Sequence, residues 1–462
     1  MIFKCTKSWD SRYNDLICCI YWVEMFIIYL CAEMNYQYFT KHIFPCGLRF
    51  AFKRSSSQVA YCALNIKTGT RSEEPEFNGL AHLTEHMLFK GTVKRSSKSI
   101  NNLIDSLGGE LNAYTNKEET VLHTTVLKED IAKAIDILFE IAFTSLFDEK
   151  ELQKEKIVVA DEINSYKDSP SEQIFDDFEE YLLEGSPLAM PVLGTIKSLK
   201  KIKSEHIKGY VSSFFIPENM SFSVVADIDE KDVIAKLNRS LRRYIIPNCI
   251  EENEASVREL TSKDVITGEQ DNNPLSVGTR FVKEVTRRNH QVHCIMGCTA
   301  YSLYDDPERL ALILLINILG GPAANSRLNM LLREREGLVY TIEANYNQYS
   351  DTGVVTIYFG CDKVNIDKCI TSVKNELKKV RDVRLTESAL KTAKKQLLGQ
   401  LAISSDNGES QCMSMGKSLL VFNDILDNDQ IRVKIEAITS DQIHEVANAI
   451  FAPERMSVLI YK

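Results

Sequence analysis

The hydrophobic pattern of the chain changes repeatedly between a helical and a strand period. Apolar residues follow helical spacing in residues 149–163 and 326–336, and they alternate with polar residues in 119–126 and 338–346. Gly337 follows the second of these helices, as is typical of a helix C-terminus. Strand and helix signals alternate in both halves of the chain, which predicts an α+β (α/β) fold.

Two passages of the sequence return at a long interval. IKSEHI at residues 202–207 reappears as ITSDQI at 438–443, and PENMSFSV at 217–224 reappears as PERMSVLI at 453–460. Both pairs are separated by 236 positions, which is far too long for a solenoid repeat. The sequence therefore predicts two similar domains of about 200 residues each.

The densest candidate chemistry lies in residues 79–92, which read GLAHLTEHMLFKGT. On a helix His82 and His86 lie about 40° apart, so both imidazoles can reach one metal ion. Glu85 lies about 60° from His82, near enough to take a proton from an attacking water. The order His-x-x-Glu-His is the inverzincin signature, and the alternative is a surface helix with two unrelated histidines.

A catalytic zinc ion usually needs a third protein ligand, and the helix at 149–163 offers two. Glu155 and Glu162 are seven positions apart, so they share a helix face. One could bind the metal while the other orients a histidine ligand. Spacing alone leaves open which carboxylate has which role, and a solvated acidic helix is the alternative for the whole segment.

The sequence resembles the pitrilysin-type inverzincin zinc metallopeptidases, in particular the mitochondrial-processing-peptidase-like branch with its short two-domain bacterial members. The matching stretches are residues 79–92, the GGELNAYT run at 108–115, and 155–163. In that family the third ligand follows the second histidine by 76 positions, which implies Glu162 as ligand here and Glu155 as the residue that orients a histidine. The resemblance also implies two mostly antiparallel sheets packed with helices and facing each other across a central chamber, and a dimer.

The same resemblance gives roles to residues that would otherwise be read as ordinary surface positions. Relatives carry an arginine and a tyrosine seven apart in the second domain, and Arg333 and Tyr340 match them in type and spacing. Both are expected to stabilise the oxyanion of a tetrahedral intermediate. Asn112 and Ala113 are expected to align an extended peptide by β-strand addition. Whether Arg333 and Tyr340 serve their own chain or a partner stays open.

The repeat and the motif together divide the chain. Residues 34–248 are predicted as the zinc-binding catalytic domain, 249–283 as a polar interdomain linker, and 284–462 as the second domain. An offset near 230 carries the histidine motif onto residues 310–316, LALILLI, where no metal ligand stands. One zinc ion per chain is therefore expected, in the first domain alone.

The first 33 residues fit poorly with the rest. Residues 16–32 are apolar but are interrupted by Glu24, so we expect either a translation start at Met34 instead of Met1 or a weak membrane anchor. The twelve cysteines show no paired spacing, which favours a reducing compartment and predicts a cytoplasmic protein. A net charge of −9 argues against nucleic-acid binding.

These observations predict a zinc-dependent endopeptidase that hydrolyses small or unfolded polypeptides, acting as a homodimer or as a heterodimer with a related chain. The alternative is a non-catalytic partner or structural subunit of a heterodimeric processing peptidase or of a respiratory complex. Chains of that kind typically lose ligands from the motif, whereas this sequence keeps all of them. The physiological substrate and the cleavage preference cannot be read from the sequence.

Overall fold

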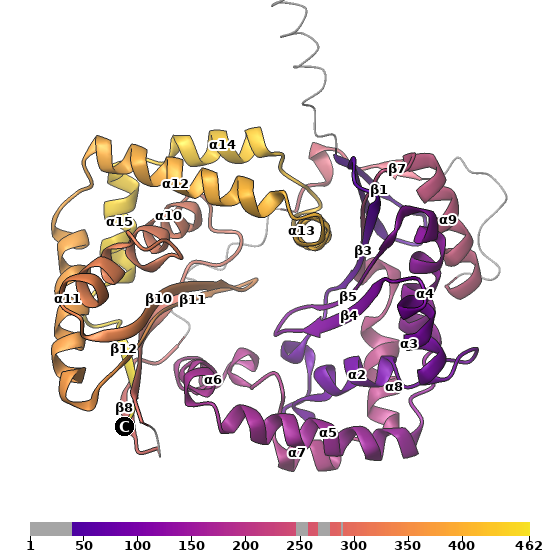
Figure 1. The fold of residues 1–462 in the computed structure, drawn as a ribbon, viewed down its shortest axis with the longest axis horizontal. Helices are drawn as coiled ribbons and strands as arrows, with labels where there is room; N and C mark the ends of the chain where they lie inside the picture. The colour runs from indigo at the N-terminus through magenta and orange to yellow at the C-terminus, as the bar shows by residue number, and fades with distance from the viewer. Residues whose placement is uncertain (1–38, 246–256, 267–277, 288–289) are drawn as a thin grey trace, which may run out of the picture. The chain divides into compact units, whose positions relative to one another are not determined.

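The computed structural model describes residues 39–245, 257–266, 278–287 and 290–462, and these contain two sheets with helices around each (Figure 1). The N-terminal extension at 1–33, the apolar stretch at 16–32 and Met34 lie outside the described residues. In the part of the chain that is described, no helix is long and apolar enough to cross a membrane.

The N-terminal sheet has seven strands in the order β4-β5-β3-β6-β2-β1-β7, and the C-terminal sheet has five in the order β10-β11-β9-β12-β8. The strands of the N-terminal sheet are β1 (Phe39–Ile43), β2 (Arg49–Arg54), β3 (Val59–Ile66), β4 (Glu110–Thr115), β5 (Thr120–Leu127), β6 (Met220–Ala226) and β7 (Arg258–Glu259). Those of the C-terminal sheet are β8 (Val282–Val285), β9 (Val292–Ala300), β10 (Val339–Gln348), β11 (Gly353–Cys361) and β12 (Ser457–Tyr461). The segment expected as a linker thus contributes β7 to one sheet and β8 to the other.

The two sheets share one plan. Strands β4, β5, β3 and β6 pair antiparallel in that order, as do β10, β11, β9 and β12. In each sheet one parallel strand follows, β2 beside β6 and β8 beside β12. The repeated passages at 217–224 and 453–460 lead into the equivalent strands β6 and β12. The α+β (α/β) fold predicted from the sequence pattern is confirmed, with the mostly antiparallel sheets that the resemblance implied.

Helices cover both sheets. Those of the first half are α2 (Leu80–Leu88), α3 (Ser97–Asp105), α4 (Ile131–Thr144), α5 (Glu149–Lys167), α6 (Pro170–Leu182), α7 (Ile196–Lys201), α8 (Ser204–Phe214) and α9 (Glu230–Tyr244), with short 3₁₀ turns that include η1 (Thr70–Ser72) and η4 (Pro187–Ala189). Those of the second half are α10 (Glu308–Gly320), the π-helix η8 (Asn329–Arg335), α11 (Ile366–Asp382), α12 (Glu387–Ser405), α13 (Gly408–Phe422), α14 (Asn428–Ala437) and α15 (Ser440–Ile450).

In each half, one helix packs against the sheet of the other half. Helix α6 follows α5 in the first half, but its apolar side chains Ile174, Phe178 and Leu182 pack with Ile295 and Tyr461 of the C-terminal sheet. Helix α13 follows α12 in the second half and lies against β2, β3 and β6 of the N-terminal sheet (Figure 1). The two exchanged helices stand at equivalent places in the repeat, so the exchange is reciprocal.

The face of the N-terminal sheet that receives α13 is polar and closely packed. The Ser221 hydroxyl donates to the carbonyl of Gly416 at 2.7 Å, and the Ser223 hydroxyl donates to the carbonyl of Cys412 at 2.7 Å. A Cβ atom on Gly416 would lie 2.1 Å from Asn65 Oδ1, so only glycine allows this approach. Removing α13 would take away both of these acceptors and open this face of the sheet to water.

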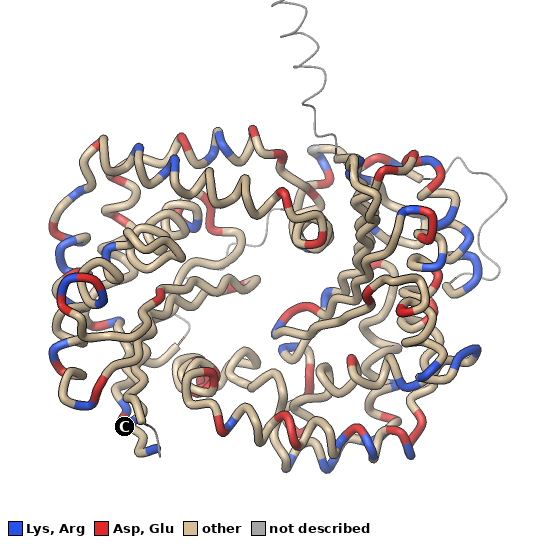
Figure 2. The backbone as a smooth tube through the Cα atoms, in the orientation of Figure 1, with Lys and Arg blue, Asp and Glu red and all other residues tan. Residues whose placement is uncertain are grey.

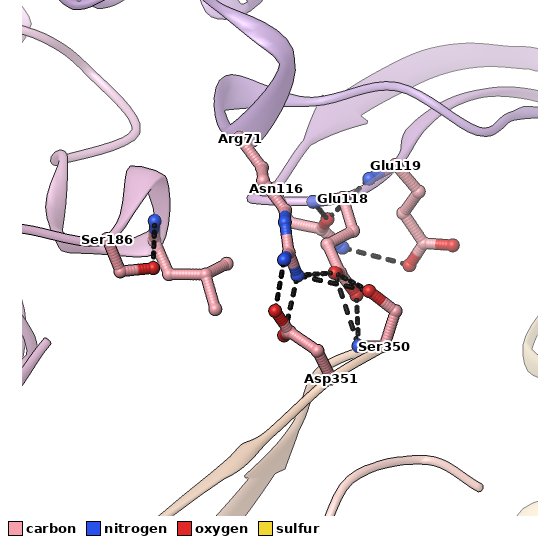
Figure 3. A network of polar contacts seen from close by, with 8 residues as sticks. Arg71, Asn116, Glu118, Glu119, Ser186, Ser350 and Asp351 are labelled. Atoms are coloured by element: carbon pink, nitrogen blue, oxygen red, sulfur yellow. Dashed lines mark hydrogen bonds and ion pairs between the residues drawn. The ribbon is translucent and has the colours of Figure 1, made fainter. Parts of the chain in front are cut away.

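The tips of two equivalent hairpins meet in a polar network (Figure 3). Arg71 of η1 donates from Nη1 to Glu118 Oε1 at 2.7 Å, in the β4–β5 turn, and to Asp351 Oδ1 at 2.8 Å, in the β10–β11 turn. The Ser350 hydroxyl donates to Glu118 Oε1 at 2.6 Å. Because η1 contacts α2, the network ties the second half to the segment that leads into the histidine motif.

A buried ion pair stands beside these tips. Lys117 Nζ lies 3.1 Å from Glu179 Oε2 of α6, and both side chains are less than a tenth exposed. The Tyr349 hydroxyl and the Asn347 amide donate to Glu179 at 3.0 Å each. Burial raises the pKa of the neighbouring Asp176 to about 6, an effect that Lys117 opposes. Removing either charge of the pair would leave the other buried without compensation, so the pair holds α6 in its exchanged position.

Figure 2 shows acidic and basic residues mixed along the outer helices α5, α11 and α14, whereas α6 carries acidic residues alone and the short helix α7 carries lysines alone. A nucleic-acid-binding face would require a continuous basic stripe. The expectation, made from the net charge, that nucleic acid is not a partner stays a prediction.

Candidate metal centre

Helix α2, which carries the histidine motif, begins at an uncommon cap. Gly79 has φ +91°, and a Cβ atom there would lie 2.8 Å from the carbonyl oxygen of Leu193. Glycine has no side-chain acceptor for the first helical N–H groups, and the Glu73 carboxylate accepts them instead, from Gly79 N at 2.8 Å and Ala81 N at 2.6 Å. Burial raises the pKa of Glu73 to about 7, although these two donors oppose the shift. The start of the helix is therefore fixed by the Glu73 carboxylate, which lies outside the histidine motif, six positions before Gly79.

His82 and His86 lie one turn apart on α2 and face Glu162 of α5. The Nε2 atom of His82 lies 3.8 Å from Glu162 Oε2, and that of His86 lies 3.6 Å from it. One ligand atom from each of the three residues falls within 4.8 Å of the others. Donors held about 2.0–2.1 Å from a tetrahedral zinc ion stand about 3.3–3.4 Å apart, so small side-chain adjustments suffice. The structure brings together the three residues that the sequence and the resemblance gave as ligands.

The chemistry of this donor set fits a zinc ion. Glu162 Oε2 is buried yet accepts no hydrogen bond from the described residues, so a cation would supply the missing partner. Burial, together with the neighbouring His86, lowers the pKa of His82 to about 4. Its imidazole is therefore neutral at neutral pH, the form that binds a metal. Two histidines and one carboxylate are a typical donor set for a catalytic zinc ion, which keeps one position open.

The two carboxylates of α5 take different positions, which their spacing alone left undecided. Glu155 is buried, with 7% of its side chain exposed, and its Oε1 atom lies 2.9 Å from His86 Nδ1. Glu162 is 43% exposed and instead faces the Nε2 atoms of both histidines. The geometry therefore favours Glu162 as the ligand and Glu155 as the residue that orients His86, in the roles that the resemblance implied.

Glu85 lies directly beside the second histidine and is largely enclosed. Burial raises the pKa of its carboxyl group, while a hydrogen bond from the Thr115 hydroxyl and the neighbouring His86 oppose that shift. A carboxylate with a raised pKa accepts a proton more readily than an ordinary surface glutamate. The arrangement suits a general base better than a further ligand.

Strand β4 offers a free edge beside this helix. Among the described residues it is the outermost strand of the N-terminal sheet, and it pairs there only with β5, where Asn112 faces His123 and Ala113 faces Leu122. Helix α2 packs against β4. An unpaired strand edge presents N–H and C=O groups to an extended peptide, so the placement suits the role predicted for Asn112 and Ala113. His123 pairs with Glu409 of α13 at 2.9 Å, as expected for a packed residue.

Tyr340 stands in a β-bulge near the start of β10. Val339 pairs with Cys361 and Thr341 pairs with Gly360, so Tyr340 is the extra residue between them. It is 56% exposed, and its hydroxyl donates to Asp362 Oδ1 at 3.1 Å. Bulges often redirect a side chain beside a functional site.

Arg333 lies on η8, a π-helix where the sequence predicted an ordinary α-helix, and such helices are frequent at functional sites. It lines a cavity of about 310 Å³ with residues of β10. Its guanidinium Nε lies 3.9 Å from Glu334 Oε1, at an exposed position. Among the described residues, no hydrogen bond or ion pair joins Arg333 or Tyr340 to the histidine–glutamate cluster. The structure therefore leaves these two residues apart from the three proposed ligands.

The equivalent place in the second half holds neutral amides. Helices α10 and α12 correspond to α2 and α5, and Gln400 of α12 stands where α5 has Glu162. The Asn317 amide nitrogen of α10 donates to Gln400 Oε1 at 2.5 Å. Within the described residues, the cluster of His82, His86 and Glu162 is the one group of three that could hold a metal.

Two family models match successive parts of the chain. Residues 49–196 match Insulinase (Peptidase family M16), and residues 201–397 match the Peptidase M16 inactive domain. YmxG of Bacillus subtilis strain 168, described as an uncharacterized zinc protease, is 30% identical over 398 residues, covering 86% of this chain and 91% of that protein. The chain belongs to peptidase family M16.

Other M16 proteins extend the comparison. The mitochondrial-processing peptidase subunit beta of Saccharomyces cerevisiae is 26% identical over 417 residues, covering 87% of each chain. The crystal structure of a protease from Helicobacter pylori superposes with a TM-score of 0.81 at 18% identity, covering 92% of this chain and all of that one. The resemblance found in the sequence is therefore confirmed, and the relatives described as zinc proteases indicate a zinc metallopeptidase.

Sequence reasoning missed two residues that shape the centre. Glu73 lies in a run without periodicity, and its only signal was indirect, because an N-cap glycine at position 79 needs an acceptor from elsewhere. Lys90 lies two positions before the end of the motif at Thr92 and contacts Glu155 Oε2 at 2.7 Å. No sequence pattern indicated that contact, since 65 positions separate the two residues.

Proposed function

We propose that this member of family M16 is a zinc-dependent endopeptidase that hydrolyses small or unfolded polypeptides, as a processing peptidase does. The observation that carries the proposal is the convergence of His82, His86 and Glu162 beside the half-buried carboxylate of Glu85. One zinc ion per chain would be held by those three residues. When bound, it would polarise a peptide carbonyl and make a water molecule more acidic.

Residues of the first half have three proposed roles in the reaction. Glu85 takes a proton from the attacking water and later passes it to the leaving amine. Glu155 keeps the His86 ring turned so that Nε2 faces the metal. Asn112 and Ala113 on the edge of β4 align the substrate as an added strand, which reads main chain more than side chain and favours broad specificity.

Residues of the second half complete the proposal. Arg333 and Tyr340 are proposed to stabilise the oxyanion that forms when water attacks the carbonyl carbon. Their exposure, and the bulge that sets Tyr340 apart from its strand, support this role because a substrate can reach both side chains. We further propose a homodimer or a heterodimer with a related chain, because one relative is itself named as a subunit. The mass of the particle in solution tests that association.

Metal removal tests the function directly. The purified protein is expected to contain one zinc ion per chain and to cleave members of an unfolded peptide library. A chelator should abolish cleavage, and added zinc should restore it, because the proposed ligands hold a removable ion. A chain that binds zinc and cleaves no peptide would instead fit the non-catalytic partner subunit, and a chain that binds no zinc would contradict the proposal.

The role of Tyr340 is tested by Tyr340→Phe. Because its hydroxyl is proposed to act on the transition state, kcat should fall by about 10²–10³-fold with little change in KM. Tyr244→Phe on α9 is the matched control, since that hydroxyl contacts Asp136 at 3.1 Å on another face, and this variant should stay active. An unchanged kcat for Tyr340→Phe would remove the tyrosine from the mechanism.

A further inference from the structure

A lysine stands behind the carboxylate–histidine pair of the metal centre. Lys90 Nζ lies 2.7 Å from Glu155 Oε2, and the other oxygen of the same carboxylate, Oε1, lies 2.9 Å from His86 Nδ1. The three side chains form an unbroken series that ends at the imidazole whose Nε2 faces Glu162. Both oxygens of Glu155 are thus engaged, one by a cation and one by a proposed ligand.

The end of α2 places Lys90 at this position. The helix ends at Leu88, and the N–H group of Lys90 donates to the carbonyl of Met87 at 3.2 Å. Gly91 follows with φ +131°, a conformation that favours glycine, so the chain turns away directly after the lysine. Lys90 is four positions beyond His86, about one helical turn along the same direction.

The two histidines are supported in different ways. The Nδ1 atom of His82 is buried and has no hydrogen-bond partner among the described residues. The Nδ1 atom of His86 has the Glu155 carboxylate, which is 7% exposed and contacts Lys90. The direction of the His86 ring therefore depends on Glu155, and a carboxylate buried to this degree depends in turn on a paired cation.

We propose that Lys90 is a positioning residue for the metal centre, which fixes the Glu155 carboxylate and through it the His86 ring. The proposal rests on the proposed function, because it takes His86 as a zinc ligand. Among the described residues, the ion pair of Lys90 is with Glu155, and no hydrogen bond or ion pair joins its side chain to a proposed ligand or to a substrate-aligning residue, so it acts through Glu155. A divalent ion and Lys90 together carry three positive charges. These balance the three negative charges that Glu85, Glu155 and Glu162 carry when ionised.

A purely electrostatic action of Lys90 on the ion would have the opposite sign. Two cations repel each other, so removing the lysine would then strengthen zinc binding. A positioning role predicts weaker binding instead, because a disoriented carboxylate no longer holds the histidine. The direction of the change in zinc affinity therefore separates the two accounts.

The test measures the zinc dissociation constant of the full chain by competition with a chromophoric chelator. Lys90→Met is expected to weaken zinc binding by about 10-fold, within the range typical of residues that support a metal ligand, while Lys90→Arg should stay near the original protein. Lys154→Met is the matched control, because Lys154 pairs with Glu151 on the surface of α5 and is 70% exposed. Circular dichroism and thermal unfolding of the metal-free proteins check the fold, and Lys90→Gln serves if Lys90→Met does not fold.

A double variant shows whether Lys90 acts through Glu155. Lys90→Met combined with Glu155→Gln should bind zinc no more weakly than Glu155→Gln alone, because the second change removes the group that Lys90 holds. Losses that multiply, or an unchanged or stronger affinity in Lys90→Met, would overturn the positioning role and leave the proposed function intact. An original protein that binds no zinc would overturn the proposed function itself.

Discussion

A Glu85→Gln protein is expected to keep its zinc and to lose peptidase activity by about 10²–10⁴-fold, the usual contribution of a general base. Glutamine has the size of glutamate and leaves His82, His86 and Glu162 unchanged. It cannot take a proton from water, so only the chemical step should suffer. The measurements are zinc content per chain and kcat/KM on one peptide that the original protein cleaves.

A matched control makes the Glu85 result specific. Glu76→Gln changes an exposed glutamate that pairs with Lys201, and it should leave both zinc content and activity unchanged. Loss of zinc from Glu85→Gln would mean that Glu85 is a ligand. Full activity with zinc in place would remove it from the proton transfer.

Substitution of each α5 carboxylate in turn by glutamine is expected to give unequal losses of zinc. Glu162→Gln removes the proposed carboxylate ligand, so stoichiometric zinc and peptidase activity should both disappear. Glu155→Gln keeps all three ligands and removes only the partner of His86 Nδ1, so zinc binding should weaken by about 10–100-fold. Metal analysis after dialysis and a competition titration measure the two outcomes.

Glu151→Gln on the same helix is the control, because its carboxylate pairs with Lys154 at the surface. It should bind zinc as the original protein does. Equal loss of zinc from Glu155→Gln and Glu162→Gln would contradict the division of roles between the two carboxylates. A greater loss from Glu155→Gln would reverse it.

The exchanged helix changes how the contribution of the second half can be tested. A fragment that ends near residue 248 would lack Arg333 and Tyr340, and the sequence alone suggests that its inactivity would assign them a catalytic role. The same fragment would also lack α13, which partners Ser221 and Ser223 of the N-terminal sheet. Removing α13 also loses the apolar burial that this helix contributes, which destabilises the fragment by itself. Point variants of the full chain, such as Tyr340→Phe, avoid that ambiguity.

The first half of the metal centre could be predicted because its signals are local. His82, Glu85 and His86 lie within one helical turn and a half, where the period of the helix fixes which side chains share a face. Strand alternation and a repeat of 236 positions likewise gave the fold class and two similar sheets. The pairing of α2 with α5 had no such local signal, so the choice between Glu155 and Glu162 needed the resemblance.

The contacts between distant segments were decided by the tertiary structure alone. The sequence by itself determined the elements, the histidine motif and the duplication, because each rests on a short-range period or on self-similarity. It could not show that α6 and α13 exchange places or that Lys90 contacts Glu155. Each of these contacts joins segments whose order along the chain says nothing of their distance in space. They form because a buried polar group must find a partner wherever the fold brings one.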